Sequence, residues 1–340
     1  MAMRRSVVLR RRPQGEPVPE DFEVIEDAIP TPAEGEIVTR TIYLSLDPYM
    51  RGRLSEAKSY AKPVAIGEVM TGETVGEVVA SAHPGYAPGD IVVGPRGWST
   101  HCVSAGTSAW GAALSKLRKG EAKLSYYLGI LGMPGVTAYS GMTDIGQPKA
   151  GETVVVSAAS GAVGSVVGQL AKRAGARAVG IAGGADKCRF VREELGFDDC
   201  IDHRAPELRK ALAAACPKGV DVYFENVGGA VQAAVFPLLN DFGRMVMCGM
   251  VAEYNNTEPA PGPNLMSVVR KRLRIEGLIV SDKPERFDEW RKLAAPWVMD
   301  GSLRYREDVV EGLDHAAEAF IGLLSGKNFG KLVVRVGAEP

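Results

Sequence analysis

Residues 153–165 constrain the fold of this chain more than any other stretch. They begin with Thr-Val-Val-Val-Ser, an apolar run typical of a parallel strand that is covered on both faces. Small residues follow, and Val163, Val167 and Leu170 then recur at helical spacing. A strand, a tight turn and a helix in this order direct backbone N–H groups and the positive end of the helix toward one point. This arrangement suits the pyrophosphate of a dinucleotide.

The turn within this stretch reads Ala-x-x-Gly-x-x-Gly, so the first glycine of the common Gly-x-Gly-x-x-Gly pattern is absent. The residues that follow strengthen the interpretation, because strand-like and helix-like segments alternate from about residue 132. Strands are predicted at 153–157, 178–182, 199–202, 221–225, 244–248 and 275–280, and helices at 162–174, 185–195, 206–215 and 230–239. Such alternation predicts an α/β fold with a parallel, doubly wound sheet.

The first third of the chain has a different pattern. Short β-type runs alternate there with turn residues, at 36–44, 76–80 and 91–93. This pattern predicts a small antiparallel barrel. After a helix near 284–300, we expect a closing strand at 331–336 to return to this first domain, which would place the active cleft between two domains. The expected domains are a substrate domain of residues 1–130 with 305–340, and a dinucleotide-binding domain of residues 131–304.

Composition and charge exclude several classes of function. The chain has 340 residues, which is enough for two domains with cores of their own, and its formal net charge is −1. The charges are dispersed, so neither nucleic acid nor an acidic membrane is an expected partner. The basic residues near the start are separated by only four residues, too few for the apolar core of a signal peptide, and no transmembrane run exists. We expect a cytoplasmic protein.

Cysteine and histidine usage argues against a metal site. The 5 cysteines are scattered and form no Cys-x-x-Cys spacing, as expected for buried thiols in a reducing compartment. The 4 histidines are dispersed too. His101 and Cys102 are neighbours, but adjacent residues seldom bind one metal, and we interpret them as an ordinary part of a strand. No zinc is predicted, and the absence of a Gly-x-Ser-x-Gly motif argues against a serine hydrolase.

The tip of the second strand indicates which nicotinamide cofactor is bound. An NAD site usually places a carboxylate about 20 residues beyond the glycine turn, where it accepts hydrogen bonds from the adenosine ribose. Here the strand ends in two glycines at 183–184, and Asp186 comes only later. Glycines leave room for a 2′-phosphate, and Lys187, with Arg189 and Arg204, can supply positive charge. We therefore favour NADP(H), while the alternative is that Lys187 and Arg189 are solvated helix residues.

Several blocks of the sequence together resemble one known family. They are Tyr-Leu-Ser-Leu-Asp-Pro-Tyr-Met-Arg-Gly at 43–52, Gly-Met-Pro-Gly-Val-Thr-Ala-Tyr at 132–139, the turn at 158–164, Tyr-Phe-Glu-Asn-Val-Gly-Gly at 223–229, Cys-Gly-Met-Val-Ala-Glu-Tyr-Asn at 248–255 and Asn-Phe-Gly-Lys at 328–331. Over nearly its whole length the chain resembles the zinc-free medium-chain dehydrogenase/reductases, and within them the NADPH-dependent alkenal and enone double-bond reductases, which include the prostaglandin reductases. The resemblance implies a GroES-like β-barrel domain, a Rossmann domain and a homodimer. Zinc-dependent relatives carry a Cys near Asp47 and a Gly-His-Glu near Gly67 and Glu68, and this chain has neither.

The resemblance also implies contacts to NADPH from several segments. They are the backbone of Gly161, Ala162, Val163 and Gly164 on the pyrophosphate, Lys187 on the 2′-phosphate, Asn226 on a ribose, the loop that contains Cys248, Gly249 and Tyr254, the backbone of Leu278, Ile279 and Val280 on the nicotinamide amide, and Asn328 over the cofactor. Relatives have a Tyr where this chain has His203, so the contact beside the adenosine phosphate is open, although a histidine could still stack or donate.

The expected reaction determines what the catalytic residue must do. Reduction of a conjugated C=C bond delivers hydride to the β-carbon, and negative charge then develops on the carbonyl oxygen as an enolate. Tyr254 is the candidate donor to that oxygen, because a phenol stays protonated at neutral pH. A ribose hydroxyl of the cofactor could share this task, and packing in the loop is the alternative role of Tyr254. Tyr49 and Met133 are expected to line an apolar substrate cleft. For Arg51 a structural role, in a salt bridge that ties its loop to the barrel, is an equal alternative.

Two other functions remain open at the level of the sequence. One is a quinone reductase of the same superfamily, which would use the same cofactor site. The other is a non-catalytic NADPH-binding protein built on this scaffold. The sequence does not identify the physiological substrate, because loops around 49–61 and 253–264 shape the cleft.

Overall fold

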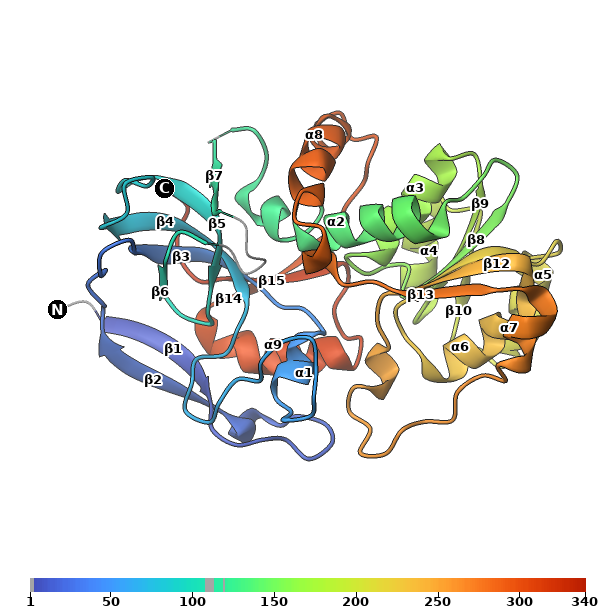
Figure 1. Ribbon diagram of the computed structural model, residues 1–340, viewed down its shortest axis with the longest axis horizontal. Coiled ribbons are helices and arrows are strands. Elements are labelled where there is room, and N and C mark those ends of the chain that lie inside the picture. Colours follow the sequence, from blue (N-terminus) through green and yellow to red (C-terminus); the bar gives the residue numbers. More distant parts are fainter. Residues whose placement is uncertain (1–2, 108–112, 119) are drawn as a thin grey trace. The chain divides into compact units, whose positions relative to one another are not determined.

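The computed structural model describes residues 3–107, 113–118 and 120–340. The chain divides into two compact units (Figure 1). One unit consists of Met1–Gly129, Glu307–Asn328 and Leu332–Pro340, and the other of Ile130–Arg306 and Phe329–Lys331. No helix in the described part of the chain is long and apolar enough to cross a membrane.

The second unit is built on a parallel sheet of six strands, in the order β10-β9-β8-β11-β12-β13. The strands are β8 (Thr153–Ser157), β9 (Arg177–Ala182), β10 (Asp199–Asp202), β11 (Val220–Glu225), β12 (Leu239–Met247) and β13 (Arg274–Gly277). The first strand in the sequence, β8, is central, and the chain continues outward on one side of it and then on the other. The strand order therefore reverses between β8 and β11, where such sheets bind ligands. The parallel, doubly wound sheet predicted from the sequence is confirmed.

Helices cover both sides of this sheet. They are α2 (Met133–Ser140), α3 (Gly164–Arg173), α4 (Ala185–Glu193), α5 (Leu208–Ala215), α6 (Gly229–Val235), α7 (Met266–Lys271) and α8 (Arg286–Met299), with a π-helical turn at Gly141–Gly146. Figure 1 shows α2 and α3 on one side of the sheet and α6 and α7 on the other. The core between sheet and helices includes Val155, Val179 and Tyr223, all fully or almost fully buried. Apolar strands enclosed in this way explain the continuous valine runs of the sequence.

Several predicted boundaries in this unit are wrong, and the strand expected at 244–248 runs from Leu239 to Met247. The helix expected at 230–239 ends at Val235, because Pro237 lies in the following 3-10 turn and β12 already begins at Leu239. The last strand ends at Gly277 rather than at 280, and Val280 begins a 3-10 turn. The helix expected from 162 begins at Gly164, which leaves residues 161–163 in the turn.

The first unit is mainly antiparallel. Its strands are β1 (Met3–Leu9), β2 (Phe22–Ala28), β3 (Ile37–Ser45), β4 (Glu73–Ser81), β5 (Ile91–Arg96), β6 (His101–Ser104), β7 (Ser115–Leu117), β14 (Glu307–Glu311) and β15 (Lys331–Arg335). Its larger sheet runs β14-β15-β3-β4-β5-β7 with β6 on β3, while β1 and β2 form a separate pair. The helices are α1 (Met50–Arg53) and α9 (Ala316–Leu324). Because Val333 pairs with Ser45, the predicted return of the closing strand to this sheet is confirmed.

An aromatic cluster marks the core of the first unit. The ring centroid of Trp98 lies 6.0 Å from that of Phe22 and 5.6 Å from that of Phe320. These three rings join β2, the segment after β5 and α9, which are distant in the sequence. Aromatic pairs at such distances stabilise a core beyond the burial of their area alone.

Candidate dinucleotide site

The turn after β8 is shaped by close backbone packing. Ala158 adopts φ +50°, and its carbonyl oxygen accepts a hydrogen bond of 2.9 Å from the Gly161 N–H. A Cβ atom at Gly164 would lie 2.3 Å from the Ala158 oxygen, so no other residue fits without a backbone shift. At Gly161 the same distance would be 3.2 Å, which a small movement relieves. The second glycine of the motif is therefore the one that this turn strictly requires.

Helix α3 begins in this turn without a side-chain cap, and its N-cap residue is Val163. The N–H of Ser165 bonds to the Gly161 carbonyl at 3.0 Å, which starts the helical ladder. Within the described residues, the N–H groups of Ala162, Val163 and Gly164 donate to no backbone or side-chain acceptor. Exposed donors at a helix N-terminus attract an anion. The turn therefore fits a pyrophosphate.

The turn after β9 is covered by two side chains that follow β10. A Cβ atom at Gly183 would lie 2.9 Å from His203 Nε2 and 3.1 Å from Arg204 Nε. Asp202 holds this corner together, because its Oδ1 accepts hydrogen bonds of 2.9 Å from the N–H groups of Gly184 and Arg204. These bonds lower the pKa of Asp202. Its carboxylate is thus occupied by backbone donors.

The charge around this second turn is positive. Burial lowers the pKa of His203, and the neighbouring Arg204 and Lys187 add to the decrease while Asp202 opposes it. The imidazole is therefore neutral at neutral pH beside two cations. Arg189, in contrast, pairs with Asp186 at 2.7 Å on the exposed face of α4. The solvated-helix alternative thus holds for Arg189.

Asn226 is fixed where β8 and β11 end side by side. Its N–H donates to Ser157 Oγ at 2.7 Å, and its Nδ2 donates to the Ser157 carbonyl oxygen at 2.8 Å. The Glu225 carbonyl accepts the N–H groups of Cys248 and Gly249 at 3.0 and 3.1 Å, which ties the end of β12 to the same place. Three strand ends therefore meet at the reversal of strand order, next to the turn after β8.

Tyr254 lies in the loop after β12. Its hydroxyl oxygen accepts a hydrogen bond of 3.4 Å from the Met250 N–H, and a Cβ atom at Gly249 would lie 2.9 Å from it. The phenol thus packs against Gly249. Burial, together with the Glu225 carboxylate, raises the pKa of the adjacent Cys248 thiol to about 12. This cysteine is therefore a neutral packing group.

The remaining predicted residues are placed as follows. The Leu278 N–H donates to the Met247 carbonyl at 3.1 Å, so the segment that continues through Ile279 and Val280 leaves the sheet beside β12. Met133 is the first residue of α2. Tyr49 and Asn328 belong to the antiparallel unit, Tyr49 directly before α1 and Asn328 between α9 and β15. Arg51 donates to the Gly15 carbonyl at 2.7 Å, which is a structural contact.

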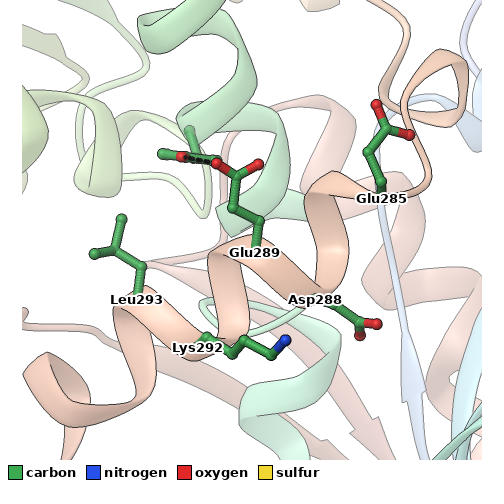
Figure 2. Close-up of a pocket in the computed structure, with 6 residues that line it drawn as sticks. Glu285, Asp288, Glu289, Lys292 and Leu293 are labelled. Atoms are coloured by element: carbon green, nitrogen blue, oxygen red, sulfur yellow. Dashed lines mark hydrogen bonds between the residues drawn. The ribbon is translucent and has the colours of Figure 1, made fainter.

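Sequence reasoning missed the side chains of Ser157 and Glu225. Ser157 Oγ donates to Glu225 Oε1 at 2.7 Å in the fully buried core. The available signal was that each polar residue ends a largely apolar strand. A hollow of about 710 Å³ lies elsewhere, lined by Tyr139, Glu285, Asp288, Glu289, Lys292 and Leu293 (Figure 2). It contains none of the predicted site residues, and its Tyr139–Glu289 hydrogen bond of 2.7 Å joins α2 to α8.

Comparisons with known proteins show the family of the chain. Residues 5–111 match the model of the N-terminal domain of oxidoreductase, and residues 162–298 match that of zinc-binding dehydrogenase. The chain is 51% identical over 338 residues to the NADPH-dependent curcumin reductase of Escherichia coli (strain K12), with 98% of this chain and 96% of that protein covered. It is 39% identical over 341 residues to the NADP(+)-dependent 2-alkenal reductase of Nicotiana tabacum, with 98% of each covered.

A solved structure is similar over the same range. The crystal structure of CurA from Vibrio vulnificus in complex with NADPH aligns with a TM-score of 0.93 at 48% identity and covers 98% of this chain and 100% of that chain. The chain therefore belongs to the medium-chain dehydrogenase/reductases, in their family of NADPH-dependent enone and alkenal reductases. An Escherichia coli quinone oxidoreductase in complex with NADPH, 21% identical with a TM-score of 0.78, shares the fold.

Proposed function

We propose that this chain uses NADPH to reduce the C=C bond of α,β-unsaturated aldehydes and ketones. The observation that carries the proposal is the pair of neighbouring turns at the ends of β8 and β9. The first offers backbone N–H groups to a pyrophosphate, and the second offers Lys187 and Arg204 where an NAD site would have a carboxylate. Family membership adds the substrate class, because curcumin and 2-alkenals both carry a conjugated C=C bond.

The catalytic step requires a proton donor at the carbonyl oxygen. NADPH, when bound, supplies the hydride that reaches the β-carbon. Tyr254 transfers its hydroxyl proton to the carbonyl oxygen as enolate charge develops there. The resulting enol then takes a proton from solvent at its α-carbon and returns the O–H proton to the Tyr254 oxygen, which leaves a saturated carbonyl product and a neutral tyrosine. Because its phenol oxygen already accepts the Met250 N–H, the hydroxyl hydrogen is directed away from that backbone group. Tyr49 and Met133 are the proposed contacts to the apolar part of the substrate.

The reaction is proposed to need no metal ion. The residues near the positions of the family's zinc ligands make local hydrogen bonds instead. Asp47 accepts the Ser45 hydroxyl, and Glu68 Oε2 accepts the Ala65 N–H at 3.0 Å. In the described part of the chain, no three His, Cys, Asp or Glu side chains are grouped closely enough to hold a metal. Dialysis against a chelator should leave activity intact, whereas an inactivation that zinc reverses would contradict the proposal.

A substrate panel tests the function against its two alternatives. NADPH oxidation is measured with a medium-chain 2-alkenal, a cyclic enone and a simple quinone. The proposal predicts turnover with the first two and little with the quinone. A quinone reductase would show the opposite order. A non-catalytic binding protein would bind NADPH and turn over none of the three.

The remaining expectations concern assembly and location. We propose a homodimer and a cytoplasmic protein. Free thiols support the location, since Cys102, Cys188, Cys200, Cys216 and Cys248 form no disulfides. Light scattering of the purified protein tests the dimer, and a monomer at micromolar concentration would contradict it.

A further inference from the structure

A buried carboxylate lies beneath the proposed cofactor site. The Glu225 side chain is 0% exposed and accepts three hydrogen bonds. Ser157 Oγ and the Val227 N–H donate to Oε1 at 2.7 and 2.6 Å, and Tyr223 Oη donates to Oε2 at 2.6 Å. No ion pair of Glu225 occurs among the residues that the structure describes. A buried carboxylate without a cation is tolerated only when donors of this kind satisfy it.

The direction of the hydrogen bonds can be assigned without seeing hydrogens. Ser157 Oγ receives the backbone N–H of Asn226 at 2.7 Å, and an N–H can only donate. The Ser157 hydroxyl hydrogen has two acceptors within reach, Glu225 Oε1 at 2.7 Å and the Phe224 carbonyl oxygen at 3.4 Å, and the much shorter contact directs it to Glu225. Asn226 therefore donates to Ser157, and Ser157 donates to Glu225. The Glu225 carboxylate sets this direction because it only accepts.

The same contacts assign the two ends of the Asn226 amide. The group that faces the Ser157 carbonyl oxygen at 2.8 Å must be the NH₂ group, because a carbonyl oxygen only accepts. The amide oxygen, Oδ1, is then the end left for a ligand. A ribose hydroxyl that donates to this oxygen is the natural partner, which makes Asn226 an acceptor in the cofactor site.

The strand order shows which half of the cofactor is concerned. Lys187, His203 and Arg204 follow β9 and β10, on one side of β8, and Asn226 follows β11 on the other. A dinucleotide whose 2′-phosphate lies at the turns after β9 and β10, and whose pyrophosphate lies over the end of β8, extends its nicotinamide ribose toward Asn226. We propose that Ser157 and Glu225 are positioning residues that hold Asn226 as an acceptor for a hydroxyl of the nicotinamide ribose. This inference rests on the proposed NADPH site.

Tyr223 provides a matched control for Ser157. Both side chains donate to the same carboxylate, and both are 0% exposed. Tyr223 packs in the apolar core between sheet and helices and makes no hydrogen bond to Asn226. Ser157→Ala therefore breaks the link to Asn226, whereas Tyr223→Phe removes an equivalent donor and leaves that link in place.

The test measures binding to the purified apo-protein by calorimetry, with two probes. NADPH contains both halves of the cofactor, and adenosine 2′,5′-bisphosphate contains only the adenosine half with its 2′-phosphate. Ser157→Ala should weaken the binding of NADPH by about tenfold and change the affinity for the bisphosphate by less than about twofold. Tyr223→Phe should leave both affinities within about twofold of the wild type and lower only thermal stability.

Substitutions of Glu225 separate positioning from charge. In Glu225→Gln the amide oxygen can still accept from Ser157 and Val227, and the NH₂ group can donate to Tyr223 Oη, so NADPH binding should be kept within about threefold. Glu225→Leu should lose as much affinity for NADPH as Ser157→Ala does. It serves as the second variant if Ser157→Ala does not fold. The inference would be overturned if Glu225→Gln and Glu225→Leu lost equal affinity for NADPH. Equal losses of NADPH affinity in Ser157→Ala and Tyr223→Phe would overturn it as well. A wild-type protein that binds neither probe would instead contradict the proposed NADPH site.

Discussion

The turns after β8 and β9 offer two different kinds of donor to a phosphate. After β8 the donors are backbone N–H groups, and the decisive contact is the 2.3 Å that a Cβ atom at Gly164 would make with the Ala158 oxygen. After β9 the groups are side chains, with His203 and Arg204 over Gly183. A backbone cradle binds any dinucleotide pyrophosphate, because it contains no group that reads the 2′ position. We therefore propose that the side chains after β9 and β10 determine the preference for NADPH.

The largest effect should come from Gly164→Ala. The added methyl group would overlap the Ala158 carbonyl, so the turn must open and its N–H groups move away from the pyrophosphate. We expect the affinities for NADPH and NADH to fall together, by about a hundredfold. Gly161→Ala is the matched control and should cost far less, because its contact would be 3.2 Å. A loss of affinity for NADPH alone would show that the first turn does contact the 2′-phosphate.

Tyr254→Phe tests the proton donor, which neither turn supplies. Turnover of a 2-alkenal should fall by about a hundredfold, since a donor to the enolate oxygen is lost. The dissociation constant of NADPH, measured by fluorescence titration, should stay within about twofold because no proposed phosphate contact changes. Unchanged turnover would remove Tyr254 as the donor and leave the ribose hydroxyl as the candidate.

Lys187→Ala and Arg204→Ala should change the second turn alone. Each should weaken the binding of NADPH by about tenfold and the binding of NADH by less than about twofold, because a charge-assisted contact to the 2′-phosphate is lost. Steady-state titration with both cofactors gives the ratio. Arg189→Ala serves as the control, since Arg189 pairs with Asp186 on the helix surface. Equal losses of NADPH and NADH would contradict this assignment.

The smallest effect concerns His203 and pH. Burial and the neighbouring Arg204 and Lys187 lower its pKa in the folded state below the ordinary histidine value of 6.5. The unfolded chain therefore binds more protons at this position, so stability is lost as the pH falls through about 6.5 toward the folded pKa. Urea unfolding between pH 7.5 and 5 should show a smaller decrease for His203→Gln than for the wild type. Parallel curves would mean that the imidazole is not enclosed as described.

Much of the fold could be predicted from local patterns. Strands 153–157 and 199–202 match β8 and β10 residue by residue, because in each an apolar stretch is bounded by polar or turn residues. The boundary between α6 and β12 was wrong because Pro237 ends the helix and the next strand starts without a loop. Periodicity alone contains no information about such an abrupt change.

The network around Glu225 shows why the rest of the site could not be predicted. Ser157 and Glu225 are 68 residues apart in the sequence and meet only through strand register, which pairs Val156 with Phe224. A single residue of slip would turn these side chains to opposite faces of the sheet. The family resemblance of the sequence therefore predicts Asn226 as a site residue, whereas the side chains that hold Asn226 are visible only in the folded sheet.

The fate of the transferred hydride tests the account most directly. The enzyme is supplied with NADPH that carries deuterium at the transferable position and with a medium-chain 2-alkenal, and the product is examined by NMR. The account predicts a saturated aldehyde with deuterium on the β-carbon, formed much faster with NADPH than with NADH. Deuterium on the carbonyl carbon of an allylic alcohol, or equal rates with both cofactors, would contradict it.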